Sequence, residues 1–143
     1  MQNFKHKFPI QIRFKDVDKM GHVNNANHLT YIELARLKYF EEIVKMEDGL
    51  SKEVGLILAR IEIDYKQPLF LADQIFVYTR CSKIGTKSVE LEWQIVRDKS
   101  GTVEIVAKGI AVIVYFDYEQ GKTMLVPTKH RELIGQYEGT TFP

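Results

Sequence analysis

The fold is decided by residues 24–65, which read NNANHLTYIELARLKYFEEIVKMEDGLSKEVGLILARIEIDY. Over residues 26–45 the apolar side chains recur every three or four positions without glycine or proline, which predicts one long helix. Asn24 and Asn25 precede this helix, and a short side-chain carbonyl is well suited to capping a helix N-terminus. Over residues 57–65 apolar and polar residues alternate, which predicts a strand. The pattern therefore changes once from helical to extended.

Further strands are predicted along the rest of the chain. Runs that alternate or are rich in β-branched residues, separated by turn residues, indicate strands over residues 8–14, 74–84, 89–95, 102–118 and 123–126. Gly109 is a candidate bulge, and residues 130–137 are compatible with a short terminal helix. Consecutive strands joined by short turns must be antiparallel. We therefore predict an α+β fold, with one long helix packed against one curved antiparallel sheet of about five strands.

Length and charge exclude several classes of protein. The chain has 143 residues, so we expect a single domain over residues 1–143. A formal net charge of +1 argues against a dedicated nucleic-acid-binding protein, which normally carries a basic excess. No apolar run approaches the roughly 18 residues of a membrane span, and no signal-peptide pattern is present. Together with a lone cysteine, Cys81, these features predict a cytoplasmic protein without a membrane partner.

A partner of another kind is predicted by the strand over residues 102–118. Both faces of this strand are apolar, whereas a single helix covers only one face of an antiparallel sheet. We expect an apolar face of that size to be buried against a partner, most simply a second copy of the chain.

The densest group of polar residues lies between Asp16 and Glu33, in a loop that leads into the predicted helix. A helix N-terminus presents unpaired N–H groups and a partial positive charge, which can hold a developing oxyanion during acyl transfer. A carboxylate beside such donors can act as general base or nucleophile. The same residue types are typical of helix caps, so the local pattern leaves open whether Asp18 and the asparagines are catalytic or only cap the helix.

Residues 13–36, RFKDVDKMGHVNNANHLTYIELAR, resemble the signature of hot-dog-fold acyl-CoA thioesterases of the 4-hydroxybenzoyl-CoA thioesterase type. The pattern D-x-D-x-x-G-x-V lies within them, and the resemblance continues through residues 59–69 and 83–88 to about Pro127. It implies a hot-dog fold, in which the sheet wraps a long central helix and two subunits join their sheets edge to edge. It also implies hydrolysis of an acyl-CoA substrate to free acid and CoA by a homodimer or homotetramer, and no cofactor is expected.

The resemblance assigns roles to individual residues. Asp18 matches the family's catalytic aspartate, acting as general base or nucleophile, and Gly21 matches the glycine of its turn. Asn25 falls where the helix N-terminus offers its backbone N–H to the thioester carbonyl. The run HVNN at residues 22–25 is similar to plastid acyl-ACP thioesterases, although Met20 stands where these carry asparagine. Two alternatives therefore stay open: an acyl-ACP thioesterase, and a non-catalytic acyl-thioester-binding protein on the same fold.

Further candidates for substrate binding are His22, His28, Lys83, Lys87 and Ser88. His28 stands where many family members carry tyrosine, and hydrogen bonding within the loop is the favoured interpretation of His22. In the family, basic residues near the turn over residues 83–88 often meet the CoA phosphates, and a solvated turn is the alternative. For Glu33 an ion pair with Arg36 is favoured over catalysis. The spacing of the Asp and His residues matches no zinc pattern, so no metal is expected.

Overall fold

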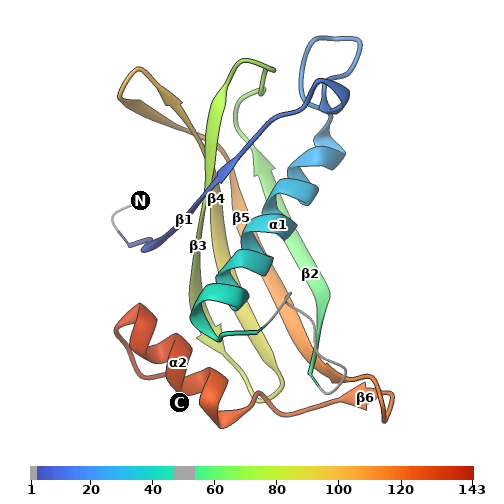
Figure 1. Cartoon of the computed structure of the whole chain (residues 1–143), viewed down its shortest axis with the longest axis vertical. Helices are drawn as coiled ribbons and strands as arrows, with labels where there is room; N and C mark the ends of the chain where they lie inside the picture. The colour runs from blue at the N-terminus through green and yellow to red at the C-terminus, as the bar shows by residue number, and fades with distance from the viewer. Residues whose placement is uncertain (1–2, 47–53) are drawn as a thin grey trace.

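The protein consists of one antiparallel sheet with a long helix lying across one of its faces (Figure 1). The computed structural model describes residues 3–46 and 54–143. The strands are β1 (His6–Ile10), β2 (Gly55–Tyr65), β3 (Gln74–Ile84), β4 (Ser88–Lys99), β5 (Thr102–Asp117) and β6 (Lys122–Thr123). The helices are the 3-10 helix η1 (Phe14–Asp16) and the α-helices α1 (Asn25–Ile43) and α2 (Thr128–Glu138).

The strand order is β1-β3-β4-β5-β2, with β6 added to the end of β5. Every pairing is antiparallel. Short turns require this for the pairs β3–β4, β4–β5 and β5–β6. β1 and β2 are therefore the edge strands of the sheet. Pro9 lacks a backbone N–H and is tolerated in β1 because this strand has a neighbour on one side only.

Helix α1 packs its apolar side against the inward-facing side chains of the sheet. The largest side chains of this core that are almost completely buried include Ile32, Tyr39, Phe40, Leu69, Ile75, Leu91, Trp93, Ile95, Ile113, Tyr115 and Ile134. Burying each such side chain contributes roughly 1.5–3 kcal/mol. The core therefore holds α1 firmly against the sheet, which fixes the position of its N-terminus at one end of the molecule (Figure 1).

Gly109, on β5, allows the backbone of β2 and the Trp93 side chain of β4 to approach β5 closely. A Cβ atom at this position would lie 1.8 Å from the carbonyl oxygen of Glu62 and 2.8 Å from Cζ2 of Trp93. The bulge predicted at Gly109 is wrong, because the register of β4 against β5 shifts at Val106 instead. Glycine is required at this position because any side chain would collide with β2 and with Trp93 of β4.

Several fold predictions need correction. The expected single helix is accompanied by α2, which contains the terminal segment 130–137; only Ile134 and Gly135 of α2 are buried, so its apolar pattern is weak. The first strand, expected over residues 8–14, ends at Ile10, where the chain leaves the sheet for η1. The sheet has six strands when the two-residue β6 is counted. No helix among the described residues is both long and apolar enough to cross a membrane.

Candidate active site

The N-terminus of α1 carries an unpaired backbone donor. Asn24 caps the helix, as predicted, from an extended backbone conformation, and its Oδ1 accepts a hydrogen bond from the Ala26 N–H at 2.9 Å. The N–H of Asn25 has no acceptor within residues 3–46 and 54–143. Because it lies at the positive end of a 19-residue helix, this N–H is suited to bind a developing negative charge.

Asp18 and Gly21 form the tight turn that leads into this cap. The Asp18 carbonyl accepts from the Gly21 N–H at 3.0 Å, and Asp18 Oδ1 accepts from the Met20 N–H at 2.9 Å. Gly21 has a φ of +83°, a left-handed conformation that favours glycine, so its role is to shape the turn. The Asp18 side chain is exposed, and its Oδ2 accepts no hydrogen bond from the described part of the chain.

Asp16, only two residues before Asp18, is a structural carboxylate. It is buried and accepts hydrogen bonds from the Tyr31 hydroxyl at 2.7 Å and the Arg13 N–H at 3.0 Å. Its backbone carbonyl accepts from the Asn24 N–H and the Asn27 side-chain amide. Burial favours a higher pKa for Asp16, but these hydrogen bonds and the Arg13 charge outweigh it and lower the pKa. Asp16 therefore ties the loop to α1.

A cavity of about 250 Å³ opens at this helix N-terminus and reaches the end of β2. Its lining residues are His22, Val23, Asn25, His28, Tyr65, Lys66, Gln67 and Pro68. The predicted site residues Asn25, His22 and His28 are thus brought together, and the turn of Asp18 and Gly21 adjoins them in the chain without lining the cavity. The site therefore combines a helix N-terminus with the end of an edge strand.

His28 lies in the first turn of α1 and is only 3% exposed. Its Nδ1 is 3.4 Å from the carbonyl oxygen of Asn24. Since a carbonyl only accepts hydrogen bonds, Nδ1 carries the proton in this contact and Nε2 is left as an acceptor. Burial lowers the pKa of His28 despite its hydrogen bonds to backbone carbonyls, which favours the neutral imidazole.

Tyr65 is a site residue that the sequence analysis did not single out. Its hydroxyl donates to the carbonyl of Asn25 at 3.3 Å, and its ring meets the His28 ring edge-on, with centroids 5.1 Å apart. The sequence feature that could have pointed to Tyr65 is its place as the last apolar residue of the predicted strand, shortly before Pro68. That position indicates a strand end but not what the strand end touches.

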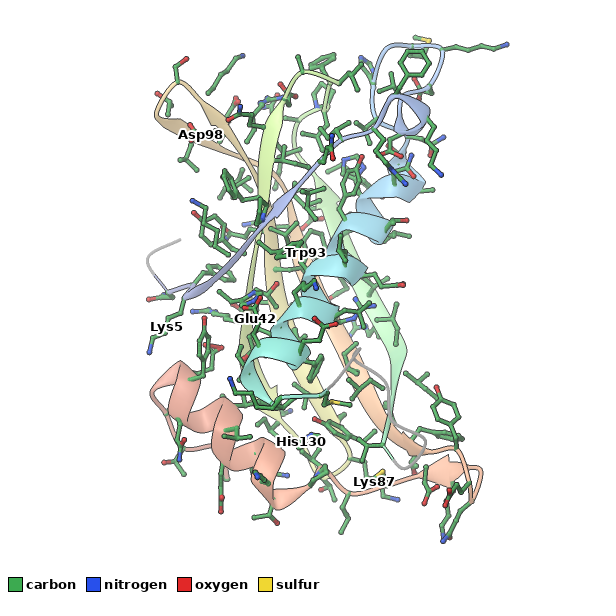
Figure 2. The ribbon with its side chains drawn as sticks, in the orientation of Figure 1. Lys5, Glu42, Lys87, Trp93, Asp98 and His130 are labelled. Carbon is green, nitrogen blue, oxygen red and sulfur yellow. The ribbon has the colours of Figure 1, made fainter. Side chains whose placement is uncertain are left out.

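The remaining candidates for substrate binding, Lys83, Lys87 and Ser88, lie at the opposite end of the sheet. Lys87 is labelled there in Figure 2. Ser88 pairs with Val114, which also pairs with Ile57 near the start of β2. Tyr65, at the other end of β2, contacts Asn25. Within a single chain, Lys83, Lys87 and Ser88 are therefore far from the turn of Asp18.

The other candidate groups have structural partners. Glu33 lies 4.0 Å from the Arg36 guanidinium, so the favoured ion pair is present. Cys81 is buried, and burial raises the pKa of its thiol to about 12, which leaves it protonated and unreactive at neutral pH. Within residues 3–46 and 54–143, no three His, Cys, Asp or Glu side chains are grouped so that they could hold a metal ion.

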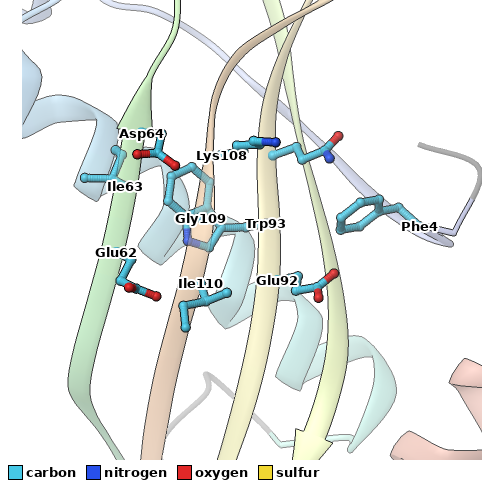
Figure 3. A pocket seen from close by; sticks show the side chains of 10 residues that line it. Phe4, Glu62, Ile63, Asp64, Glu92, Trp93, Lys108, Gly109 and Ile110 are labelled. Carbon is cyan, nitrogen blue, oxygen red and sulfur yellow. The ribbon is translucent and has the colours of Figure 1, made fainter.

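A larger depression of about 630 Å³ lies on the sheet (Figure 3). Charged side chains from three strands line it, namely Glu62, Asp64, Glu92 and Lys108. It contains no helix N-terminus and none of the predicted site residues. Its excess of carboxylates disfavours the anionic groups of a CoA thioester, so we assign the candidate site to the smaller cavity at α1.

Comparison with known proteins identifies the family. Residues 12–134 match the model of the thioesterase-like superfamily. The chain belongs to this superfamily. The protein is 37% identical to a thioesterase from Thermus thermophilus that was solved with coenzyme A and zinc. That comparison covers 99% of this chain and 100% of the other, with a TM-score of 0.85. The fold is thus the hot-dog fold that the sequence resemblance implied.

Two relatives whose names state an enzymatic activity align over most of this chain. It is 25% identical over 127 residues to the long-chain acyl-CoA thioesterase FadM of Escherichia coli, covering 89% of this chain and 95% of the relative. It is also 25% identical over 134 residues to the chloroplastic acyl-acyl carrier protein thioesterase ATL2 of Arabidopsis thaliana, covering 93% and 70%. The predicted enzyme class, a thioester hydrolase, is confirmed. The 4-hydroxybenzoyl-CoA type stays a prediction.

Proposed function

We propose that this protein hydrolyses acyl thioesters of coenzyme A at the N-terminus of α1. The observation that carries the proposal is the unpaired Asn25 N–H, which belongs to a cavity-lining residue four positions after the turn of Asp18 and Gly21. The relatives that hydrolyse or bind CoA compounds support CoA as the carrier of the acyl group. A purely binding role is disfavoured, because binding alone needs no exposed carboxylate beside the thioester.

In the proposed mechanism, the thioester carbonyl oxygen accepts a hydrogen bond from the Asn25 N–H. Asp18 then acts in one of two ways: it deprotonates a water that attacks the carbonyl carbon, or it attacks that carbon itself and the resulting anhydride is hydrolysed. The C–S bond breaks in either case, and CoA leaves as a thiolate, which needs little help from an acid. The Asn25 N–H stabilises the negative charge that develops on the carbonyl oxygen.

Replacing Asp18 with asparagine tests this mechanism. We expect Asp18→Asn to lower kcat by about 10²–10⁴-fold, because a general base contributes a factor of that size, while the melting temperature stays near that of the wild type. The readout is thiol release from acyl-CoAs of varied chain length.

The matched control is Asp98→Asn. Asp98 also caps a turn, since its Oδ1 accepts from the Gly101 N–H at 3.0 Å, but it lies in the β4–β5 hairpin (Figure 2). Asp98→Asn is expected to keep wild-type turnover. Near-normal turnover in Asp18→Asn contradicts the proposed role of Asp18.

We further propose that the active enzyme is a homodimer joined through β2. This strand is 11 residues long, pairs on one side with β5, and forms the edge of the described sheet. A long free edge is a template for pairing with another chain. The apolar side chains of Ile110, Val112 and Val114 on β5 remain partly exposed, which offers a further surface for a homotetramer.

This dimer gives the distant lysines a role. Antiparallel pairing of two β2 strands reverses one sheet relative to the other, so the partner's turn with Lys83, Lys87 and Ser88 comes to the end at which Asp18 lies. We propose that these side chains bind the phosphates of CoA in the partner's site. The balanced net charge of +1 fits this arrangement, because a few local lysines suffice.

An acyl-ACP substrate is the second candidate. The match to ATL2 over 93% of this chain and the run HVNN at residues 22–25 favour it, whereas Met20 departs from that pattern. Parallel assays with acyl-CoA and acyl-ACP of the same acyl group decide between the carriers, since the preferred carrier gives the higher kcat/KM.

A further inference from the structure

The peptide groups on both sides of Asn25 are held by side chains. The peptide that joins Asn24 to Asn25 carries the free N–H, and its carbonyl lies 3.4 Å from Nδ1 of His28. The next peptide, between Asn25 and Ala26, donates its N–H to Asn24 Oδ1 and accepts from the Tyr65 hydroxyl at 3.3 Å. Two peptide planes in the first turn of α1 are therefore constrained from the helix and from β2.

We propose that Tyr65 and His28 are positioning residues that aim the Asn25 N–H at the thioester carbonyl. This inference rests on the proposed function and deepens it, because it names the side chains that orient the carbonyl-binding donor. His28, predicted as a contact for the substrate, acts here through the backbone. Tyr65 acts likewise through the carbonyl of Asn25.

Physical chemistry gives each contact a distinct effect. The first residues of a helix donate no i→i−4 hydrogen bonds, so within the described residues the peptide between Asn24 and Asn25 is held through its carbonyl alone, which accepts from the Asn27 N–H at 2.9 Å and lies 3.4 Å from His28 Nδ1. A hydrogen bond from His28 to the Asn24 carbonyl polarises the same peptide group and strengthens its N–H as a donor. The Tyr65 hydroxyl ties the helix N-terminus to β2, because Tyr65 is the last residue of that strand. A donor held in this way needs little reorganisation during the reaction.

The environment of His28 fits this role. The side chain is almost fully buried, lines the cavity, and contacts the Tyr65 ring edge-on. A neutral imidazole with its proton on Nδ1 donates to the Asn24 carbonyl without adding a charge to the cavity. His28 and Tyr65 thus form one packed unit between α1 and β2.

Tyr65→Phe tests the proposal, since it keeps the ring against His28 and removes only the hydroxyl. A single hydrogen bond contributes about 0.5–1.5 kcal/mol, so we expect kcat to fall about 2- to 10-fold with KM nearly unchanged. Tyr78→Phe is the matched control, because Tyr78 lies on β3 and pairs with Lys7 of β1, at the edge of the sheet away from β2. It is expected to keep wild-type kcat.

A binding measurement separates positioning from a general structural effect. Two non-reactive probes are used: an α,α-difluoroketone analogue of an acyl-CoA, in which CH₂ replaces the thioester sulfur and whose hydrate mimics the tetrahedral intermediate, and an S-alkyl-CoA thioether, which lacks the carbonyl. Tyr65→Phe is expected to raise the Kd of the ketone by the same factor by which kcat falls and to leave the Kd of the thioether unchanged. His28→Phe, which keeps a ring but loses the donor, is expected to behave in the same way.

The outcomes distinguish this inference from the proposed function. Wild-type kcat and ketone affinity in Tyr65→Phe overturn the positioning role, and so does an equal loss of affinity for both probes. Should His28→Phe fail to fold, Tyr65→Phe still decides. If the wild type hydrolyses no acyl-CoA and binds neither probe, the proposed function itself fails.

Discussion

Asp16 and Asp18 show how the surroundings of a residue decide its role. The two aspartates are two positions apart in the same loop, yet Asp16 is 2% exposed and Asp18 is exposed. A buried carboxylate is tolerated only when donors surround it, and Tyr31 and Arg13 supply them to Asp16. The exposed carboxylate of Asp18 keeps an oxygen available for chemistry.

Replacing Asp16 is expected to affect stability and its dependence on pH. Asp16→Asn should lower the free energy of unfolding at pH 7 by about 1–3 kcal/mol, because buried donors lose their charged acceptor. The pKa of Asp16 in the folded state lies below its unfolded value of about 3.9. Its ionised form therefore contributes stability above that pH, and the contribution is lost as the pH falls through the folded-state pKa.

Urea unfolding of both proteins at pH 7 and in steps down to about pH 3 measures this effect. The difference in stability between wild type and Asp16→Asn should shrink in the acidic range. Asp98→Asn serves again as the control. A difference that stays constant with pH contradicts the assignment of Asp16 as an ionised structural carboxylate.

At the scale of elements, the contact of β5 with β2 depends on Gly109. Its missing side chain leaves room for the Glu62 backbone and for the Trp93 ring, and Trp93 belongs to the same buried core as α1. Helix α1 and strand β2 are the two elements that meet at the candidate site. Gly109 therefore allows β5 to pair closely with β2, the strand whose end lines the cavity.

Gly109→Ala is expected to destabilise the protein by about 1–3 kcal/mol or more, because the new Cβ overlaps backbone atoms that cannot yield without shifting β2. Trp93 is the single tryptophan of the chain, so its fluorescence reports both unfolding and any change in this contact. Lys108→Ala, at the neighbouring exposed position of β5, should leave stability within about 0.5 kcal/mol of the wild type. Equal stability of the two variants would show that the sheet accommodates the extra carbon.

At the scale of the whole molecule, the predicted site is divided between two ends of the sheet. Asn25 and the Asp18 turn lie at one end, and Lys87 lies at the other. A long edge strand and the partly exposed apolar face of β5 support pairing with a second copy. In the proposed dimer, each site takes Asp18 from one chain and Lys87 from its partner.

Complementation tests this division. Asp18→Asn chains alone are expected to be inactive, and Lys87→Ala chains alone to show a raised KM for acyl-CoA. Co-expressed with different tags and purified as a mixed dimer, the two chains should restore one site with wild-type kcat and KM. A pantetheine thioester, which lacks the nucleotide phosphates, is the control substrate and should be insensitive to Lys87→Ala. No recovery in the mixed dimer contradicts a shared site.

Most of the local structure is predictable from the order of the residues alone. The helix period, the Asn24 cap and the alternating strands were predictable because they depend on neighbours within a few residues. The turn at Gly21 and the start of the helix near Asn25 were predictable for the same reason. Helix α2 was placed only approximately, since few of its side chains are buried.

Which of these residues contact one another depends on tertiary packing. The Tyr65 hydroxyl and the Asn25 carbonyl are 40 positions apart in the chain, and Asp16 and Tyr31 are 15 apart. Such contacts depend on how α1 packs against the sheet, and the hydrophobic periodicity of the sequence does not predict them. The same packing separated Lys83, Lys87 and Ser88 from Asp18 within one chain. Local propensity acts over one helical turn or one strand pair, whereas burial and register act across the whole fold.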